Sequence, residues 1–211
     1  ISYIGSDFNE TFVYRNYRLK FLIPLIVNFY LTIEKIMVKR SVLTFVTGQK
    51  LYDQYKKYNV HKVTPITDLL DLNQNISKDF SSKRFLFCSG KISKQKGIIS
   101  LIDSVKKLSS KIKIDVVGEW PEYEESKIGL KNIHYHGYVT DKLKRKNFYL
   151  NAKTLLILSK GEGFPRVIYE GILNRCLILC TRIESIEKNL KGFKIFFIND
   201  RDDITEVSKK N

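Results

Sequence analysis

The chain has 211 residues, which is enough for one large domain or two small ones, and 43% of them are apolar, as in a globular protein with a buried core. Its formal net charge of +15 fits an anionic partner, such as nucleic acid, an acidic membrane surface or a phosphorylated small molecule, and fits simple solubility equally well. The three cysteines form no CxxC pair, which argues against a disulfide framework and a zinc site and favours a reducing, cytoplasmic setting.

Residues 1–80 predict a mixed segment and not a complete doubly wound domain. Helical spacing covers Leu19–Lys39 and Lys50–Tyr58, and Val42–Thr47 has the composition of a strand. The polar stretch around residues 73–82 predicts a linker. Because the chain begins at Ile1 and not at Met, we expect a fragment or a processed chain.

The most apolar stretch, Phe21–Ile33, is interrupted by Pro24 and Asn28. Its 13 residues fall short of the roughly 20 that a helix needs to cross a bilayer. We therefore expect either a buried helix or a helix that lies on a membrane surface, with burial favoured. No signal peptide is recognisable.

From residue 81 onward, short apolar runs alternate with helical spacing. The predicted strands are Arg84–Cys88, Ile112–Val117, Asn132–His136, Thr154–Leu158, Leu177–Cys180 and Lys194–Ile198. The predicted helices between them are Ile98–Leu108, a short one near Glu122–Lys127, Asp141–Leu150, Pro165–Leu173 and Glu184–Leu190. Repeated strand–helix alternation with continuous apolar strands predicts an α/β fold with a doubly wound parallel sheet over residues 81–211. Ligands in such sheets bind at the carboxyl ends of the strands.

The loop after the first of these strands combines glycines and lysines. Gly90 and Gly97 bracket Lys91, Lys94 and Lys96 just before a predicted helix. Free N–H groups at a helix start favour an anion, and lysine ammonium groups suit phosphate oxygens. A loop of this kind can also be merely solvated, and the Gly-Lys-Ser/Thr ending of a Walker loop is absent.

A second loop, Ser159–Val167, places Glu162 between two glycines and Pro165 at the start of a helix. The N–H groups of Arg166 and Val167 then have no partner within the helix and can bind a diphosphate. Glu162 on the loop and Glu170 in the helix can accept hydrogen bonds from sugar hydroxyls. An ion pair between Glu170 and Arg166, four residues earlier, is the structural alternative.

Two further loops follow the second and third strands of this region. Gly118-Glu119-Trp120-Pro121 and His136-Gly137-Tyr138-Val139 can border a pocket for a nucleotide base. His134 and His136 share one face of a strand, but the sequence offers no further ligands for a metal, so a structural role is favoured.

Taken together, these loops resemble the C-terminal donor-binding domain of retaining glycosyltransferase family four, which has the two-domain GT-B fold. The resemblance covers about residues 85–190 and rests on the order and spacing of the four loops. Its most specific element is the pair Glu162 and Glu170, separated by seven residues.

The resemblance implies which groups bind the donor diphosphate. Lys96 would hold it, and Lys91, where the family usually has Arg, would do so with less geometric control. The Arg166 and Val167 N–H groups would stabilise the leaving diphosphate. Gly90, which opens the lysine loop, would also belong to the donor-binding site.

The resemblance also implies the sugar and nucleoside contacts. Glu162 would contact the transferred sugar, and the Gly163 and Phe164 backbone would line its site. Glu170 would bind the ribose hydroxyls, while Gly118, Tyr138 and Val139 would border the base. The donor would be a nucleotide sugar linked to UDP or GDP, and no metal or other cofactor is expected.

The sequence departs from the family pattern in two places. Asn174-Arg175-Cys176 replaces a glycine-containing turn, and Thr181–Glu187 lacks the glycine expected before its glutamate. Residues 1–80 resemble only the tail of the N-terminal, acceptor-side domain. We therefore expect an incomplete enzyme that binds its donor poorly.

The sequence leaves three functions open. The first is transfer of a sugar with retention to a saccharide or lipid-linked acceptor, in surface polysaccharide or lipopolysaccharide biosynthesis, by a cytoplasmic enzyme at the inner face of the plasma membrane. The second is a basic nucleic-acid-binding protein, although no nucleic-acid-binding motif is present and no nucleic-acid partner is expected. The third is an inactive module that keeps only the nucleotide-sugar-binding fold.

Overall fold

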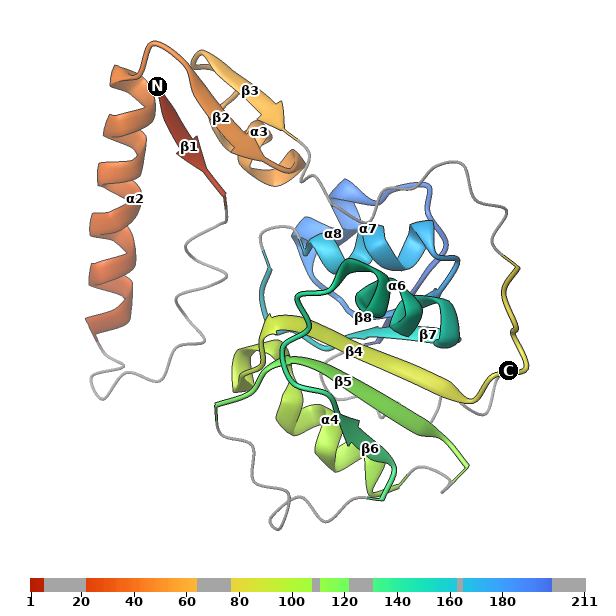
Figure 1. Cartoon of the computed structure of the whole chain (residues 1–211). Coiled ribbons are helices and arrows are strands. Elements are labelled where there is room, and N and C mark those ends of the chain that lie inside the picture. Colours follow the sequence, from red (N-terminus) through yellow and green to blue (C-terminus); the bar gives the residue numbers. More distant parts are fainter. Residues whose placement is uncertain (6–21, 64–76, 108–110, 122–130, 163–164, 199–211) are drawn as a thin grey trace. The chain divides into compact units, whose positions relative to one another are not determined.

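The computed structural model describes residues 1–5, 22–63, 77–107, 111–121, 131–162 and 165–198 (Figure 1). The chain divides into two compact units. The first unit comprises Ile1–Ile66, Lys160–Pro165 and Ile183–Phe193, and the second comprises Thr67–Ser159, Arg166–Arg182 and Lys194–Asn211. The linker predicted at 73–82 lies partly outside the described residues, and the division falls earlier, between residues 66 and 67.

The second unit is built on a six-stranded sheet. Its strands are β4 (Arg84–Lys91), β5 (Lys113–Glu119), β6 (Ile133–Tyr135), β7 (Thr154–Ile157), β8 (Leu177–Thr181) and β9 (Ile195–Ile198). They lie in the order β6-β5-β4-β7-β8-β9, and every neighbouring pair is parallel. The predicted doubly wound α/β fold is therefore confirmed. The strand order reverses between β4 and β7, which is where such sheets bind their ligands.

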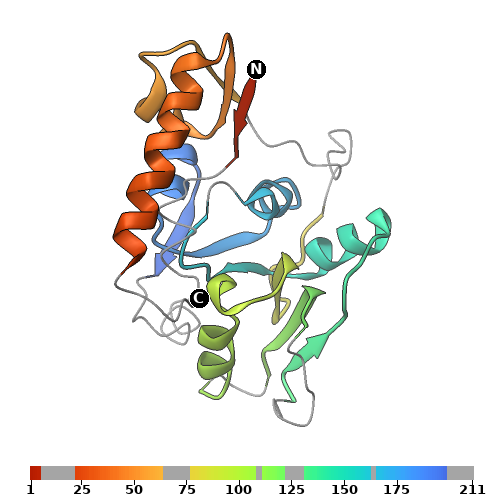
Figure 2. The same ribbon diagram turned by 90° about the vertical axis from the view of Figure 1, so that its left-hand side faces the viewer.

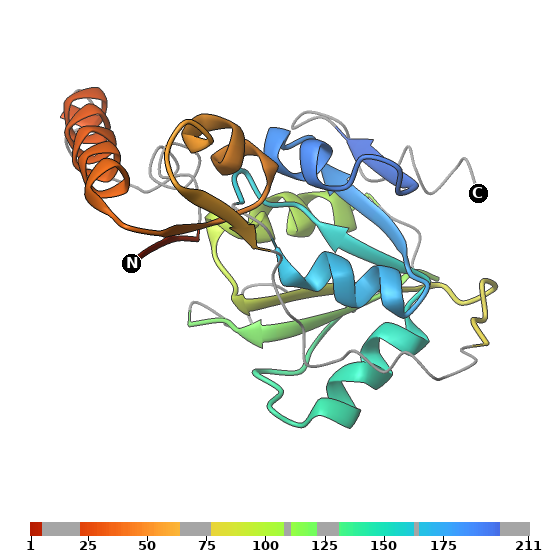
Figure 3. The same cartoon turned by 90° about the horizontal axis from the view of Figure 1, so that it is seen from above.

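Helices cover both faces of this sheet. Figure 3 shows α4 (Ile98–Val105) on one face and α6 (Lys142–Asn151) with α7 (Arg166–Leu173) on the other. Asp141 fixes the start of α6, because its carboxylate accepts a hydrogen bond from the Lys144 N–H at 2.7 Å. The helix predicted near Glu122–Lys127 lies outside the described residues.

The core of the second unit lies between the sheet and these helices. Leu86, Val116 and Leu156 on three neighbouring strands are almost fully buried, which explains why the strands are continuously apolar. The cysteines predicted as core residues behave as such, since Cys180 is buried in β8 and Cys88 is half-buried in β4. Burial raises the pKa of the Cys88 thiol to about 11, so it stays protonated.

The first unit contains a small parallel sheet in the order β1-β2-β3. Its strands are β1 (Ser2–Ile4), β2 (Thr44–Thr47) and β3 (Val60–Val63), and its helices are α2 (Ile23–Arg40), α3 (Gln49–Tyr55) and α8 (Glu184–Asn189). Figure 2 shows α2 beside β1. The sequence predicted α2, β2 and α3 but neither β1 nor β3, because these short strands have no clear periodicity.

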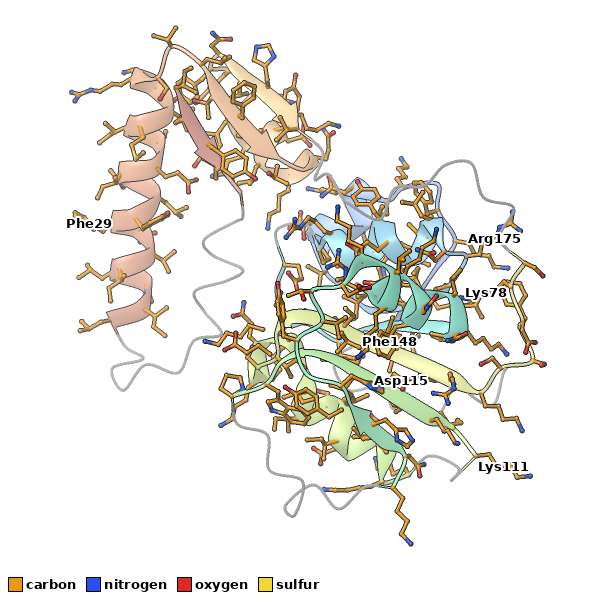
Figure 4. The ribbon with its side chains drawn as sticks, viewed as in Figure 1. Phe29, Lys78, Lys111, Asp115, Phe148 and Arg175 are labelled. Atoms are coloured by element: carbon orange, nitrogen blue, oxygen red, sulfur yellow. The ribbon has the colours of Figure 1, made fainter. Side chains whose placement is uncertain are left out.

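The helix α2 is only partly buried, so the prediction of a buried helix for Phe21–Ile33 is wrong for most of its surface. Val27 and Val38 are buried, whereas Leu25 is 71% exposed and Phe29 68% exposed. Figure 4 labels Phe29 on α2. The apolar residues of α2 run around most of its circumference, and one three-stranded sheet can cover only one side of it. Within the described residues, no helix is both long and apolar enough to cross a membrane.

Candidate functional site

The lysine loop and the start of α7 lie at the same edge of the six-stranded sheet. Lys91 ends β4, and Lys96 ends a short 3₁₀ turn, η2 (Lys94–Lys96), that follows it. Arg166 begins α7, which follows β7, the parallel neighbour of β4. Because β4 and β7 flank the switch point, these three residues come from loops at the carboxyl edge where a ligand is expected.

Two glycines let the backbone segments at this edge pack closely. Gly97 adopts the left-handed conformation with φ 85°, and a β-carbon there would lie 2.0 Å from the carbonyl oxygen of Leu158. At Gly118, with φ 144°, a β-carbon would lie 1.9 Å from the carbonyl oxygen of Ser89. Only glycine fits either position, so the lysine loop is held tightly against both neighbouring strands.

The start of α7 provides backbone donors, as the sequence predicts. Its first N–H groups, including those of Arg166 and Val167, have no acceptor within the helix. The side chain of Arg166 is exposed, and no ion pair joins it to Glu170. The alternative in which Glu170 merely balances Arg166 is therefore wrong.

Glu170 is buried and faces α6. Its Oε2 accepts a hydrogen bond from the hydroxyl of Tyr149 at 2.6 Å. Burial raises the pKa of Tyr149 well above its ordinary value, so its hydroxyl keeps its proton and remains a donor. Since a carboxylate can accept about four hydrogen bonds, this bond positions Glu170 without exhausting its capacity.

Lys78 binds the carboxyl ends of α6 and α7. Its ammonium group donates to the carbonyl oxygen of Tyr149 and, at 3.2 Å, to that of Asn174. The amide of Asn174 in turn donates to the carbonyl oxygen of Glu170 at 2.8 Å. Burial lowers the pKa of Lys78, because the charged ammonium group loses part of its hydration. Lys78 and Asn174 therefore fix the helices that carry Tyr149 and Glu170.

Glu162 belongs to the first unit, whereas Lys91, Lys96 and Glu170 belong to the second. Its side chain is buried, and its carbonyl oxygen accepts a hydrogen bond from the Ser185 hydroxyl at 2.6 Å, near the start of α8. Gly163 and Phe164 lie outside the described residues. The apposition of Glu162 with Lys96 and Glu170 stays a prediction.

The two loops that are predicted to border the base are joined by hydrogen bonds. The Tyr135 hydroxyl donates to the Gly118 carbonyl oxygen and accepts from the Trp120 N–H, both at 3.0 Å. The Gly118 N–H donates to the Gly137 carbonyl oxygen at 2.9 Å. Tyr138 is 65% exposed at this edge, while Val139, next to it, is buried.

His136 takes part in a polar cluster within the sheet. Asp115 in β5 accepts hydrogen bonds from Arg84 at 3.0 Å and shares one with the Nε2 of His136 at 2.7 Å. The His136 ring also packs on Phe148 of α6, with centroids 4.6 Å apart. The predicted structural role of His136 is thus confirmed. No group of three or more potential metal-ligating side chains occurs among the described residues.

A cavity of about 170 Å³ lies in the first unit, between β1 and α2. Residues 2–5 and residues 30–38 of α2 contribute to its lining, including Tyr30, Glu34 and Met37. None of the residues that the sequence predicts for the functional site contributes to this cavity.

The amino-acid sequence matches the family described as glycosyl transferases group 1 over residues 71–210. The chain belongs to this family. No curated protein gives a significant match to this sequence.

Solved structures of similar fold are glycosyltransferases with the GT-B architecture. Sucrose-phosphate synthase from Thermosynechococcus elongatus superposes with a TM-score of 0.68 at 13% identity, over 87% of this chain and 52% of that one. HepE from Anabaena, in complex with UDP and glucose, gives 0.66 at 14% identity, over 85% and 56%. TarM from S. aureus, in complex with Fondaparinux, α-GlcNAc-glycerol and UDP, gives 0.65 at 16%, over 84% and 38%. The group 1 chain thus spans about half the length of its structural relatives or less.

Three residues that support the candidate site were missed by the sequence analysis. Tyr149 binds Glu170, Ser185 binds the Glu162 backbone, and Lys78 joins two helix ends. Each lies more than 20 residues from its partner, so no local spacing indicates the contact. Both α6 and α8 are mostly polar in sequence, so neither Tyr149 nor Ser185 stands out in its helix.

Proposed function

We propose that this chain binds a nucleotide-sugar donor at the carboxyl edge of its six-stranded sheet and takes part in transfer of the sugar with retention, as in glycosyltransferase family four. The observation that carries the proposal is the convergence of the lysine loop and the start of α7 on adjacent strands at the switch point. The similar HepE and TarM structures hold UDP, which supports a UDP-linked donor, with GDP as the other candidate.

In this proposal the diphosphate binds between Lys91, Lys96 and the first N–H groups of α7. When the bond between the sugar and the diphosphate breaks, negative charge develops on the leaving phosphate oxygen. Lysine ammonium groups and the N–H groups of Arg166 and Val167 stabilise that charge without reorganising. No metal ion or other cofactor is then needed to neutralise the leaving group.

The two glutamates act on the other parts of the donor. Glu170, positioned by Tyr149, accepts hydrogen bonds from the ribose hydroxyls. Glu162 and the Gly163 and Phe164 backbone contact the transferred sugar. Gly118, Tyr138 and Val139 border the base, while Gly90 allows the diphosphate close to the β4 backbone.

The acceptor is proposed to be a saccharide or a lipid-linked saccharide in surface polysaccharide or lipopolysaccharide biosynthesis. The net charge of +15 and the exposed apolar residues of α2 support work at the inner face of the plasma membrane. The partial first unit corresponds to the acceptor side of the enzyme. Residues 1–80 would then contribute only part of the acceptor site.

A thermal-shift experiment tests donor binding. The chain is heated with and without UDP, GDP, ADP and their sugar conjugates, and the unfolding midpoint is recorded. A ligand present at about one hundred times its dissociation constant adds roughly 2.7 kcal/mol to the free energy of unfolding. We expect UDP or GDP and their sugar conjugates to stabilise the protein.

Matched variants assign the binding to the proposed residues. Lys96→Ala and Glu170→Ala should abolish the nucleotide-dependent shift, whereas Lys94→Ala, an exposed lysine in the same 3₁₀ turn, should keep it. If no nucleotide stabilises the wild-type chain, the chain is not a donor-binding module. If a nucleotide shift occurs without transfer to any saccharide acceptor, the inactive-module alternative holds.

A further inference from the structure

The opposite, amino edge of the six-stranded sheet carries a regular row of cations. Every strand begins with a lysine or arginine, either as its first residue or within two residues before it. In their order across the sheet, these residues are Lys131, Lys113, Lys83, Lys153, Arg175 and Lys194, here called the cationic row. Counted in the same way among the described residues, the last residue of each strand and the two residues after it include two cations at the carboxyl edge, Lys91 and Arg182.

Backbone hydrogen bonds align the middle of the cationic row. The Lys113 N–H donates to the Lys83 carbonyl oxygen at 3.0 Å, and the Lys153 N–H donates to the Arg84 carbonyl oxygen at 2.8 Å. Neighbouring strands lie about 4.8 Å apart, so six strands extend the row over about 24 Å. Figure 4 shows Arg175 on the same side of the sheet as Lys78 and Lys111, two further cations of this edge.

The charges of the row are not neutralised within the described part of the chain. Five of the six residues are exposed, and Lys153 is half-buried. No hydrogen bond or ion pair to a described residue engages the side chains of Lys83, Lys113 or Lys131. The acidic residues beside the row are engaged elsewhere, since Asp115 binds Arg84 and His136, and Asp79 binds Ser81.

Helix stability does not explain the row. Cations favour the carboxyl ends of helices, and α4, α6 and α7 end at this edge. Lys78 fulfils that role by donating to the last carbonyl oxygens of α6 and α7. Lys83, Lys113 and Lys131 make no such bond among the described residues, so helix capping does not account for their positions.

We infer that the cationic row is a binding site for a linear polyanionic glycan, a saccharide chain that carries carboxylate, sulfate or phosphodiester groups along its length. One cation per strand in a line suits a linear polymer of charges, whose binding releases counterions.

The position of the row also favours a polymer over a bilayer. The strand β4 has eight residues and spans about 26 Å, which separates the row from the loops at the carboxyl edge. A membrane that contacts the cationic row would lie about 26 Å from the donor loops. A polymer can bind the cationic row and still reach the donor loops with one end. The choice of a glycan as the ligand rests on the proposed function. The inference that the cationic row binds an anion does not depend on it.

Fluorescence anisotropy with a labelled heparin decasaccharide tests the inference on the full 211-residue chain. The test variant combines Lys83→Gln, Lys113→Gln and Lys131→Gln. The matched control combines Lys56→Gln, Lys57→Gln and Lys142→Gln, which changes the net charge equally at exposed lysines outside the row. We expect the row variant to weaken binding about tenfold or more and to reduce the salt slope by about 2, while the control stays close to wild type.

Each contrary outcome overturns the inference. Equal weakening by both variants means that net charge alone attracts the glycan, and absent wild-type binding means that no site exists. Row-dependent binding of a single-stranded DNA oligomer or of phosphatidylglycerol vesicles, tighter than that of heparin, assigns the row to those partners instead. Unfolding midpoints with and without UDP or GDP, measured on the same variants, show separately whether the donor site and the fold survive.

Discussion

The two edges of the six-stranded sheet are built on different principles. At the carboxyl edge, Gly97 and Gly118 let backbone segments approach so closely that no other residue fits. At the amino edge, exposed lysines follow one another from strand to strand with no described partner for several of them. A tightly packed backbone can hold lysines and free N–H groups in place for one small anion. A row of mobile side chains can only attract an extended one.

Substitution should therefore be costly at the carboxyl edge, with the largest effect at Gly97. Gly97→Ala adds a side chain at φ 85° and 2.0 Å from the Leu158 carbonyl oxygen. The left-handed conformation and the clash together predict a loss of about 2–5 kcal/mol in the free energy of unfolding. Gly90→Ala is the control, because a β-carbon there meets no atom within 4 Å. Urea denaturation of both variants measures the difference, and comparable losses would show that the close approach is not needed.

A smaller effect is expected where the site is positioned by a single hydrogen bond. Tyr149→Phe removes the hydroxyl that donates to the buried carboxylate of Glu170. Hydrogen bonds to charged groups contribute about 1.5–3 kcal/mol, so the variant should lose about that much stability and bind UDP or GDP more weakly. The control is Tyr52→Phe, whose hydroxyl has no partner among the described residues. Chemical denaturation and nucleotide titration are the measurements. Unchanged donor affinity in a destabilised Tyr149→Phe variant would limit Tyr149 to a structural role.

The sequence predicts the second unit far better than the first. Alternating apolar runs and helical spacing located all six strands of the large sheet, because strands covered on both faces are apolar throughout. The short strands β1 and β3 have half-exposed, mixed compositions and give no such signal. Periodicity predicted α2 as a helix but not how much of it is exposed, because burial depends on how much surface the neighbouring elements offer.

At the candidate site, the sequence predicts the loops but not their supports. Glycine, lysine and proline at strand ends are local features, and Lys91, Lys96 and Arg166 come to one edge as expected. Tyr149 and Lys78 act through contacts between helices that no spacing along the chain reveals. The placement of Glu162 against Glu170 also depends on how the two units associate, which the order of residues in a loop does not determine.

The smallest expected effect concerns Arg175 at the amino edge. Arg175 has φ 55° and is the only non-glycine residue of the described part with a positive φ. It lies in the turn for which the resemblance to family four predicts a glycine. Because the left-handed conformation costs a residue with a β-carbon about 1–2 kcal/mol, Arg175→Gly should stabilise the fold by about 1 kcal/mol. Lys194→Gly removes a similar exposed cation of the row from a residue without positive φ, and it should not stabilise the protein. Thermal unfolding distinguishes the two variants. Stabilisation by Arg175→Gly together with weaker heparin binding would show that the amino edge keeps a cation at the expense of stability, whereas no stabilisation would mean that the turn is relaxed around Arg175.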